Sequence, residues 1–256
     1  MRAEIGVLNQ LDADARAAFT ARYGHPDMGP VVVLIPAYNE GPSIGPVLNR
    51  IPDELLGQRV SCLVVVDGAT DDTAEVADAH GAFACVAHTN RGQGAALRLG
   101  YDVAMEHGAA YIVVIDADGQ YDPEEMEGLV KPLAAGQADL VLGSRRLGHA
   151  EVDDRFRYAG VVLFSALISR LTRSRVTDSS SGFKALTAAV ASAVELNEPQ
   201  YQASELLISA LGRGFRVVEV PVTMRPRTAG FTKKAPNLAY GLHYARVILR
   251  TWLRER

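Results

Sequence analysis

Cysteine is scarce in this sequence, which contains two, Cys62 and Cys85, among 256 residues. Both lie inside apolar runs, and neither has the spacing of a metal or redox motif, so a disulfide framework is not expected. We interpret them as reduced core residues of a cytoplasmic protein.

Excess positive charge is also lacking, because the sequence has 26 Lys and Arg residues but 30 Asp and Glu residues, which gives a net charge of −4. Without a basic balance the chain is not expected to bind nucleic acid. Its 48% hydrophobic and 22% charged residues are typical of a globular protein, and its length suits one large α/β domain.

Long hydrophobic runs are missing as well. As a helix, the uncharged stretch 159–169 would cover about half of a hydrocarbon core of about 30 Å. The C-terminal stretch 237–256 is longer, but Arg246 and Arg250 within it would each cost about 2.5–3.5 kcal/mol at the bilayer centre. Residues 1–19 have early acidic side chains and no apolar segment, unlike a signal peptide. We therefore expect a cytoplasmic chain without a spanning segment.

Two apolar helices could still meet a membrane from one side. In 237–256, aromatic residues alternate with arginines, and the helix expected at 158–171 is apolar, which suits peripheral contact with the inner face of a membrane. A core helix or a dimer contact explains the same patterns equally well. The sequence leaves these alternatives, and the oligomeric state, open.

From residue 31 the chain alternates short apolar runs with helical stretches. Continuous β-branched runs indicate strands buried on both faces, and the alternation predicts a mostly parallel α/β sheet flanked by helices. The expected strands are 31–35, 62–66, 82–87, 111–115 and 139–143, and the expected helices lie near 42–51, 71–80, 92–107 and 123–135.

The pattern changes after Gly143. We expect a basic loop, the helix 158–171, a Ser-rich turn, a helix near 202–212, two strands and a C-terminal helix. The predicted division is an N-terminal helical extension at 1–29, a main domain at 30–234 with halves 30–143 and 144–234, and an amphipathic helix at 235–256.

The stretch VVIDADGQYDPEE, residues 113–125, contains two groups of acidic residues with different expected roles. Asp122 is placed to cap the following helix, Pro123 suits its first turn, and Glu125 has the spacing of a capping box. Capping leaves Asp116 and Asp118 unexplained. These two like charges stand one residue apart at the end of a strand, so they require a cation or hydrogen-bond donors.

Every predicted strand ends in polar or glycine-rich chemistry, and in open parallel sheets ligands bind beyond these carboxyl ends. The motifs are PAYNE at 36–40, DGATDD at 67–72, NRGQG at 90–94, DADGQ at 116–120 and GSRR at 143–146. The paired aspartates suit Mg²⁺ or Mn²⁺ with a diphosphate completing the shell, and Gln120 could add a neutral oxygen. A turn whose aspartates bond their own backbone is the alternative. A dinucleotide fold is disfavoured, since no GxGxxG follows the first strand.

Taken together, these motifs resemble the family-2 glycosyltransferases of the GT-A fold. The segments 176–186 and 219–233 resemble the branch that contains dolichol- and polyprenol-phosphate sugar synthases, and the likeness covers roughly 31–234. It implies a nucleotide-sugar donor, a UDP- or GDP-sugar, and a Mg²⁺ or Mn²⁺ ion. The implied donor-binding residues are Pro36, Tyr38, Glu40, Asp67, Gly92, Gln93, Asp116 and Ala117, and the implied metal ligands are Asp116, Asp118 and Gln120.

Three positions depart from the family pattern. Val66 stands where many relatives have an aspartate, Ala69 where they have serine, and Gln93 where a lysine is common. The identity of the donor is therefore not fixed by the resemblance.

The resemblance also implies single displacement with inversion. A lipid-phosphate acceptor, with a second pKa of about 6, is largely dianionic at neutral pH and needs cations rather than a base. Candidates for holding that phosphate are Arg145, Ser181, Arg225 and Lys233, and the candidate catalytic residues are Asp118, Asp178 and Arg145. A hydroxyl acceptor would instead need a base, for which Asp178 or Glu205 is suited.

We therefore expect a metal-dependent glycosyltransferase acting on a polyprenyl phosphate. The alternatives are a soluble transferase for a small hydroxyl or phosphorylated acceptor and, from another class, a non-catalytic nucleotide-sugar-binding protein.

Overall fold

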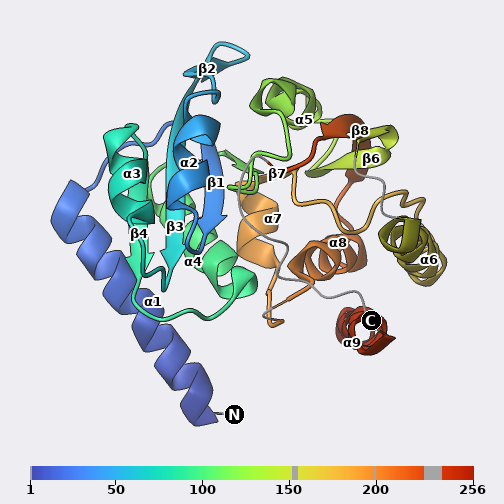
Figure 1. Cartoon of the computed structure of the whole chain (residues 1–256). Helices are drawn as coiled ribbons and strands as arrows, with labels where there is room; N and C mark the ends of the chain where they lie inside the picture. The colour runs from blue at the N-terminus through green and yellow to red at the C-terminus, as the bar shows by residue number, and fades with distance from the viewer. Residues whose placement is uncertain (1, 152–154, 199, 228–237) are drawn as a thin grey trace.

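The computed structural model describes residues 2–151, 155–198, 200–227 and 238–256. Their centre is an eight-stranded sheet of mixed direction that is mostly parallel (Figure 1). The main path runs β2-β3-β1-β5-β7-β6-β8, with β4 also paired to β3. The strands are β1 (Val31–Ala37), β2 (Glu54–Leu55), β3 (Gln58–Asp67), β4 (Phe83–Ala87), β5 (Tyr111–Val114), β6 (Leu140–Ala150), β7 (Lys184–Thr187) and β8 (Val217–Met224).

The expectation of strands buried on both faces is confirmed in β1. Its residues Val31 to Ile35 are fully buried, and alternate side chains enter two separate cores. Val32 and Leu34 belong to one core, while Val33 and Ile35 belong to the other. Because neither face meets water, the sequence has no reason to alternate polar and apolar residues.

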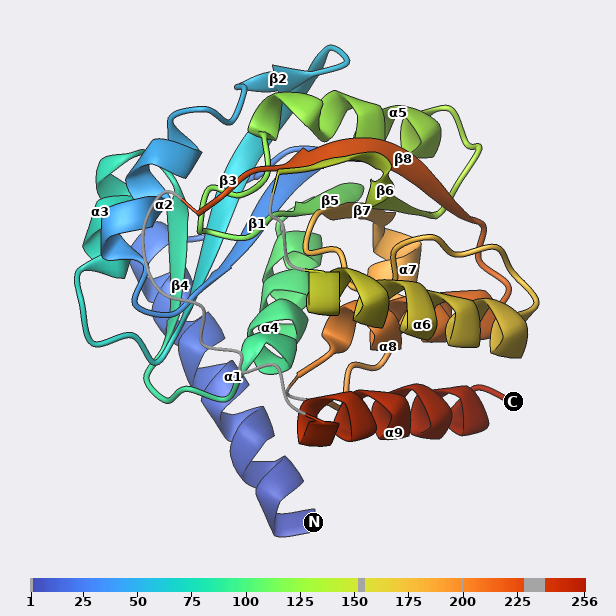
Figure 2. The same cartoon turned by 45° about the vertical axis from the view of Figure 1, so that its right-hand side comes forward.

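Helices cover both faces of the sheet (Figure 2). The helices α2 (Gly41–Leu48), α3 (Thr73–Ala79) and α5 (Met126–Ala134) supply apolar residues to one core. The other core takes residues from α1 (Arg2–Tyr23), α4 (Gln93–Glu106), α6 (Arg155–Thr172), α7 (Ala188–Ala193), α8 (Gln202–Gly212) and α9 (Leu238–Arg254). Among the described residues, none of these helices combines the length and apolarity needed to span a bilayer.

The helix α1 is attached to the outer edge of the sheet by aromatic packing. Phe19 is 2% exposed, and its ring centroid lies 4.9 Å from Tyr23, 6.2 Å from Phe83 and 5.3 Å from His107. Burial of one such phenylalanine contributes about 1.5–3 kcal/mol. Figures 1 and 2 show α1 running alongside β4 at this edge.

The second half of the sheet differs from its prediction. The expected basic loop after Gly143 continues β6 to Ala150, and the two expected C-terminal strands are one strand, β8. Pro221 is tolerated inside β8 because β8 lies at an edge of the sheet, where a missing N–H breaks no ladder. The antiparallel strand β7, between β5 and β6, was not predicted.

The predicted capping of the helix after DADGQ is half confirmed. Asp122 Oδ1 accepts a hydrogen bond from Glu124 N at 3.1 Å, as an N-cap should. The capping box is wrong, because Glu125 accepts instead from Thr223 N, at 2.9 and 3.1 Å from its two oxygens. Glu125 therefore fastens β8 to the start of α5.

Candidate active site

The polar strand ends converge at one edge of the sheet. Strands β3 and β5 both pair in parallel with β1, so their carboxyl ends point the same way. This register brings the segments after β1, β3 and β5 together, as the sequence predicted. The loop before α4 joins them through a hydrogen bond to Asp67, and the first residue of α4 through one to Asp116.

Asp116 is held from two sides. Gln93 Nε2, on the first turn of α4, donates to Asp116 Oδ1 at 3.1 Å. On the other side the backbone of Gly182 approaches so closely that a Cβ there would lie 2.0 Å from Asp116 Oδ2. Gly182 lies within the segment 176–186, but it was not among the residues that the sequence predicted for the site.

Asp118 is a buried carboxylate, 6% exposed. Its Oδ1 accepts from Gln120 N at 3.1 Å, and its Oδ2 lies 3.1 Å from Arg227 Nη2. Burial, and then the neighbouring charge of Asp116, raise the pKa of Asp118 to about 6. The fold therefore holds an ionised Asp118 at a cost that a cation would relieve.

Gln120 connects the DADGQ loop to the segment after β8. Its Nε2 donates to the Arg225 carbonyl at 3.0 Å, and its Oε1 accepts from Arg227 Nε at 3.3 Å. The Arg225 N–H also donates to the Gln120 carbonyl at 2.8 Å. The side-chain oxygen proposed as a metal ligand thus faces Arg227.

The donor set fits a hard divalent cation. Two carboxylates and an amide oxygen are the chemistry that Mg²⁺ and Mn²⁺ accept. The described residues contain no group of three or more His, Cys, Asp or Glu that could hold a metal ion. An ion at Asp116 and Asp118 would therefore take only part of its coordination shell from these side chains.

Asp67 organises the loop before α4. Its Oδ2 accepts from the N–H groups of Arg91 at 2.7 Å and Gly92 at 2.9 Å, and its Oδ1 accepts from Arg91 Nε at 3.1 Å. A carboxylate has about four acceptor positions, so about one remains for a ligand. The sequence missed Arg91, whose guanidinium is the charge partner of Asp67.

The residues after β1 line the same edge. Tyr38 is 37% exposed, and Glu40 accepts from Ser43 Oγ at 2.6 Å while its N–H donates to Thr73 Oγ1 at 2.9 Å. Pro36 lies within β1 opposite Val65. Ala117, which stands between the two aspartates in the sequence, is buried.

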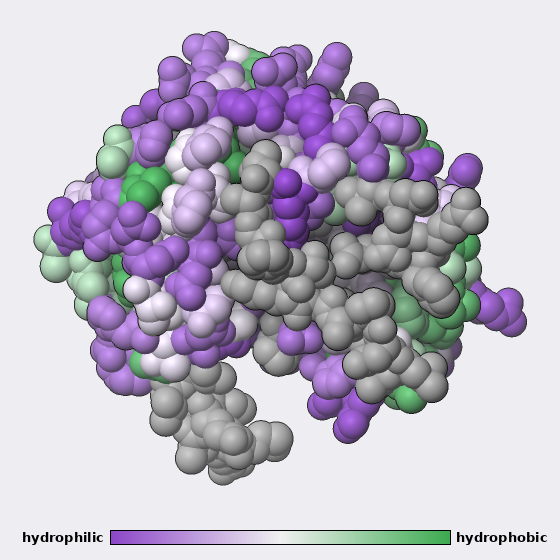
Figure 3. All heavy atoms as spheres, viewed as in Figure 1, coloured by the Kyte–Doolittle hydropathy of each residue, from purple (hydrophilic) through white to green (hydrophobic). Residues whose placement is uncertain are grey.

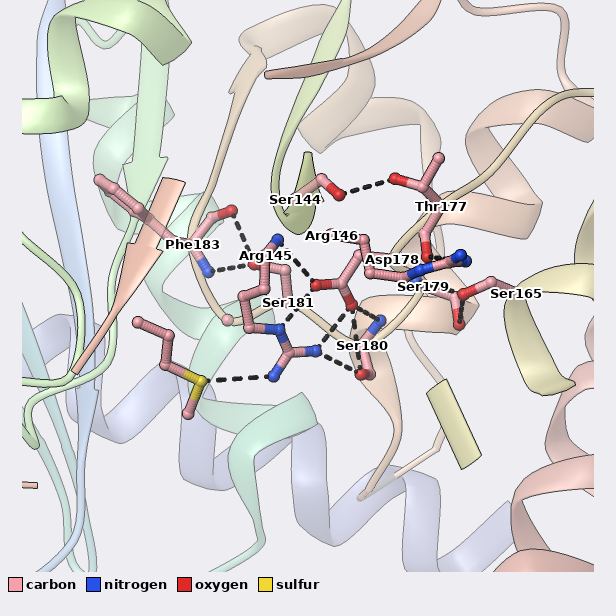
Figure 4. Close-up of polar contacts among 12 residues, drawn as sticks. Ser144, Arg145, Arg146, Ser165, Thr177, Asp178, Ser179, Ser180, Ser181 and Phe183 are labelled. Atoms are coloured by element: carbon pink, nitrogen blue, oxygen red, sulfur yellow. Dashed lines mark hydrogen bonds and ion pairs between the residues drawn. The ribbon is translucent and has the colours of Figure 1, made fainter. Parts of the chain in front are cut away.

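Arg145 and Asp178 form a buried bidentate pair (Figure 4). Arg145 Nε donates to Asp178 Oδ2 at 2.6 Å and Nη2 donates to Oδ1 at 2.7 Å, while a second bond from Nη2 reaches Ser180 Oγ at 2.8 Å. The register of β6 against β8 shifts between Ser144 and His149, which places Arg145 at an irregularity of the strand. Asp178 could act as a base only after this pair separated.

Two other predicted residues, Glu205 and Ser181, are buried, and their side chains accept hydrogen bonds from other groups of the protein. Glu205 is fully buried and accepts from Asn197 N at 2.9 Å, Glu198 N at 3.0 Å and Arg254 Nη1 at 3.0 Å. Ser181 is 1% exposed, and its hydroxyl accepts from Phe183 N at 3.2 Å.

The remaining predicted cations divide between described and undescribed residues. Arg225 is half-exposed, and its Nη1 lies 3.0 Å from Asp122 Oδ2. Arg145 Nη1 is 3.6 Å from the sulfur of Met224, so Arg145 adjoins the segment that carries Arg225 and Arg227. Lys233 lies outside the described residues.

Comparison with known proteins places the chain in a family. The sequence model described as "Glycosyl transferase family 2" matches residues 32–194. A dolichyl-phosphate hexose transferase of Haloferax volcanii is 32% identical over 231 residues, 88% of this chain and 95% of the relative. A polyprenol monophosphomannose synthase of Mycolicibacterium smegmatis is 32% identical over 215 residues, 79% of this chain and 80% of the relative.

A solved structure shows the same fold. It is glucosyl-3-phosphoglycerate synthase from Mycobacterium tuberculosis, which matches with a TM-score of 0.67 at 23% identity and covers 97% of this chain and 83% of that one. The predicted GT-A architecture and the predicted glycosyltransferase class are confirmed, as is the likeness to the polyprenol-phosphate branch. The chain belongs to glycosyl transferase family 2.

Proposed function

We propose that this glycosyltransferase moves a sugar from a nucleoside diphosphate sugar to the phosphate of a polyprenyl lipid, with Mg²⁺ or Mn²⁺ bound at Asp116 and Asp118. The observation that carries the proposal is the buried, charge-crowded Asp118, whose pKa is raised to about 6 because of burial and of Asp116. Such a carboxylate pair suits a divalent cation, whose remaining oxygen ligands a diphosphate would supply. In support, the related glucosyl-3-phosphoglycerate synthase has been solved with Mn²⁺ and UDP.

The cation would be held by Asp116 and Asp118, with Gln120 as a further oxygen once Arg227 turns away. The chemistry that it would supply there is Lewis-acid neutralisation of the charge that develops on the leaving diphosphate. Arg227, now 3.1 Å from Asp118, would then face an anion instead. Asp116 is already oriented for its role by Gln93 and by the close backbone of Gly182.

The donor would lie across the ends of β1, β3 and β5. Tyr38 and Glu40 flank the expected place of the base and ribose, and the loop 90–92 leads into the N-terminus of α4, a 14-residue helix. Helix N-termini favour phosphate groups, because their free N–H groups and dipole face the anion. Both UDP- and GDP-sugars fit this description.

The state of the candidate bases favours a phosphate as the acceptor. Both oxygens of Asp178 accept hydrogen bonds from Arg145, and both oxygens of Glu205 accept from backbone N–H groups. A phosphate dianion needs no base to attack. Its oxygen would form the new bond to the anomeric carbon as the bond to the diphosphate breaks, and Arg145, Arg225 and Arg227 would hold it.

A small phosphorylated acceptor is the second candidate. The related synthase has been solved with phosphoglyceric acid, and the same three arginines would suit any phosphate. The two candidates share the donor site and differ only in whether the acceptor carries a lipid.

The outer face of α9 suits contact with a membrane. Leu242, Leu249 and Leu253 are 65%, 43% and 63% exposed, and Arg246 and Arg250 are exposed beside them. Leu163 of the neighbouring α6 is 64% exposed, and Figure 3 shows hydrophobic residues on this flank. Exposed leucines next to arginines are typical of helices lying on anionic lipid. We propose that the protein works at the inner face of a membrane through this surface.

The test supplies UDP- and GDP-sugars with Mn²⁺ or Mg²⁺ to either a polyprenyl phosphate in vesicles or 3-phosphoglycerate, and measures nucleotide release. We expect turnover on the lipid phosphate, lost on chelation of the metal. Asp118→Asn should lower the rate at least about 100-fold, since a Lewis-acid metal is worth several kcal/mol. Asp139→Asn is the matched control, because Asp139 precedes β6 and pairs with Arg216. Turnover on 3-phosphoglycerate alone would support the second candidate, and no turnover with any pair would refute the proposal.

A further inference from the structure

The helix α1 reaches the donor site although it lies outside the segment that the family model matches, residues 32–194. Figure 1 shows α1 along the edge of the sheet beside β4. Ala15 and Phe19 are buried in that contact, which fixes the position of the helix. About two turns before Phe19, the same helix carries Asp12 towards the loop at 90–92.

Asp12, Arg91 and Asp67 form a buried charge chain. Arg91 Nη1 donates to Asp12 Oδ1, and Arg91 Nε donates to Asp67 Oδ1 at 3.1 Å. The side chain of Arg91 is 3% exposed, that of Asp67 5% and that of Asp12 16%. One guanidinium is thus placed between two carboxylates, one on α1 and one at the end of β3.

Arg91 depends on Asp12 for its orientation. Its Nη2 is buried and has no hydrogen-bond partner among the described atoms. If Asp12 lost its charge, Arg91 would keep Asp67 as its one carboxylate, and both terminal nitrogens would lack a charged acceptor. Buried nitrogens without partners are costly, so the guanidinium would be expected to turn towards another acceptor.

A turn of Arg91 would be transmitted to the strand-end carboxylates. The N–H groups of Arg91 and Gly92 both donate to Asp67 Oδ2, so the loop follows the side chain that shares this carboxylate. The next residue, Gln93, begins α4 and donates to Asp116 at 3.1 Å. The contacts are therefore continuous from α1 to Asp116.

We propose that Asp12 is a positioning residue for the donor: through Arg91 it holds the loop 90–92 in the conformation that receives the nucleotide diphosphate. The helix α1 is then part of the donor site rather than an appended segment. The nucleotide part of this inference rests on the proposed function, whereas the coupling of α1 to the loop does not.

The experiment compares Asp12→Asn with Asp14→Asn, which removes an exposed carboxylate from the same helix. Hydrogen exchange of peptides spanning 88–97 is measured without ligand. UDP and GDP are then each titrated with Mn²⁺ by calorimetry. Thermal unfolding of every variant checks that α1 stays docked, and Asp12→Glu tests whether a carboxylate on a longer side chain restores the contact.

In Asp12→Asn we expect faster exchange at the N–H groups of Arg91 and Gly92. The nucleotide that wild type binds should bind about tenfold more weakly, with a matching rise in the donor KM and little change in kcat. Asp14→Asn should match wild type, and Asp12→Glu should recover part of the affinity. Unchanged exchange, or equal nucleotide affinity in Asp12→Asn and Asp14→Asn, would overturn the proposal. If wild type bound neither nucleotide, the proposed function would fail, while the exchange comparison would still decide the coupling of α1 to the loop.

Discussion

Replacing Asp118 with asparagine should stabilise the metal-free protein while abolishing sugar transfer. Burial and the charge of Asp116 raise the pKa of Asp118 from 3.8 to about 6. A difference of about two pKa units corresponds to about 3 kcal/mol against the ionised form in the fold. Asparagine has nearly the same shape and no charge, so we expect a gain of about 2–3 kcal/mol in the free energy of unfolding near neutral pH.

The gain has a defined pH dependence. The folded carboxyl binds its proton more tightly than the unfolded one, so wild-type stability falls as pH rises from 3.8 to about 6. The asparagine variant lacks this loss. The difference between the two proteins should therefore be near zero at about pH 4 and complete above about pH 7.

Urea unfolding in the presence of a chelator, at several pH values, measures the difference. In thermal unfolding, the melting temperature of Asp118→Asn should be roughly 4–12 °C higher than that of wild type near neutral pH. Asp139→Asn is the control of opposite sign, because hydrogen bonding to Arg216 lowers the pKa of Asp139, and its loss should destabilise the protein near neutral pH. Added Mn²⁺ should stabilise wild type and not Asp118→Asn. A destabilised Asp118→Asn, or a difference independent of pH, would refute the view that the buried charge of Asp118 destabilises the metal-free fold.

Three further outcomes follow from the contacts. Asp178→Asn should lower the free energy of unfolding by about 3–5 kcal/mol, because the buried Arg145 loses its charge partner. Urea unfolding measures this free energy, and a loss under about 1 kcal/mol would contradict the prediction. Gly182→Ala should slow turnover more than about tenfold in steady-state assays, because its Cβ would lie 2.0 Å from Asp116 Oδ2, and an unaffected rate would argue against that contact. Burial raises the pKa of the Cys85 thiol to about 12, so Ellman's reagent should label it only after unfolding, and rapid labelling of the native protein would disprove its burial.

The first half of the sheet was predictable because its signals are local. Strands β1, β3, β4 and β5 each contain a continuous β-branched or apolar run, and each run is followed within a few residues by polar residues and glycine. The N-cap at Asp122 was predictable for the same reason, since it depends on residues within one turn.

The second half was less predictable because its strands depend on partners distant in the chain. Strand β7 has four residues and is a strand only because β5 and β6 lie on either side of it. The basic run 144–150 extends β6 because β8 pairs with it. Glu125 has the spacing of a capping box, yet it bonds to Thr223, 98 positions away.

The sequence alone determined the class of the molecule and predicted where its chemistry lies. A parallel sheet places every strand end at one edge, so apolar runs followed by DGATDD, DADGQ and similar motifs predicted the site without coordinates. Only the tertiary structure decided which charges pair. Asp12 with Arg91, Arg227 with Asp118, and Gly182 against Asp116 are contacts between distant segments. They depend on how helices and loops pack around the sheet, and no local spacing encodes that packing.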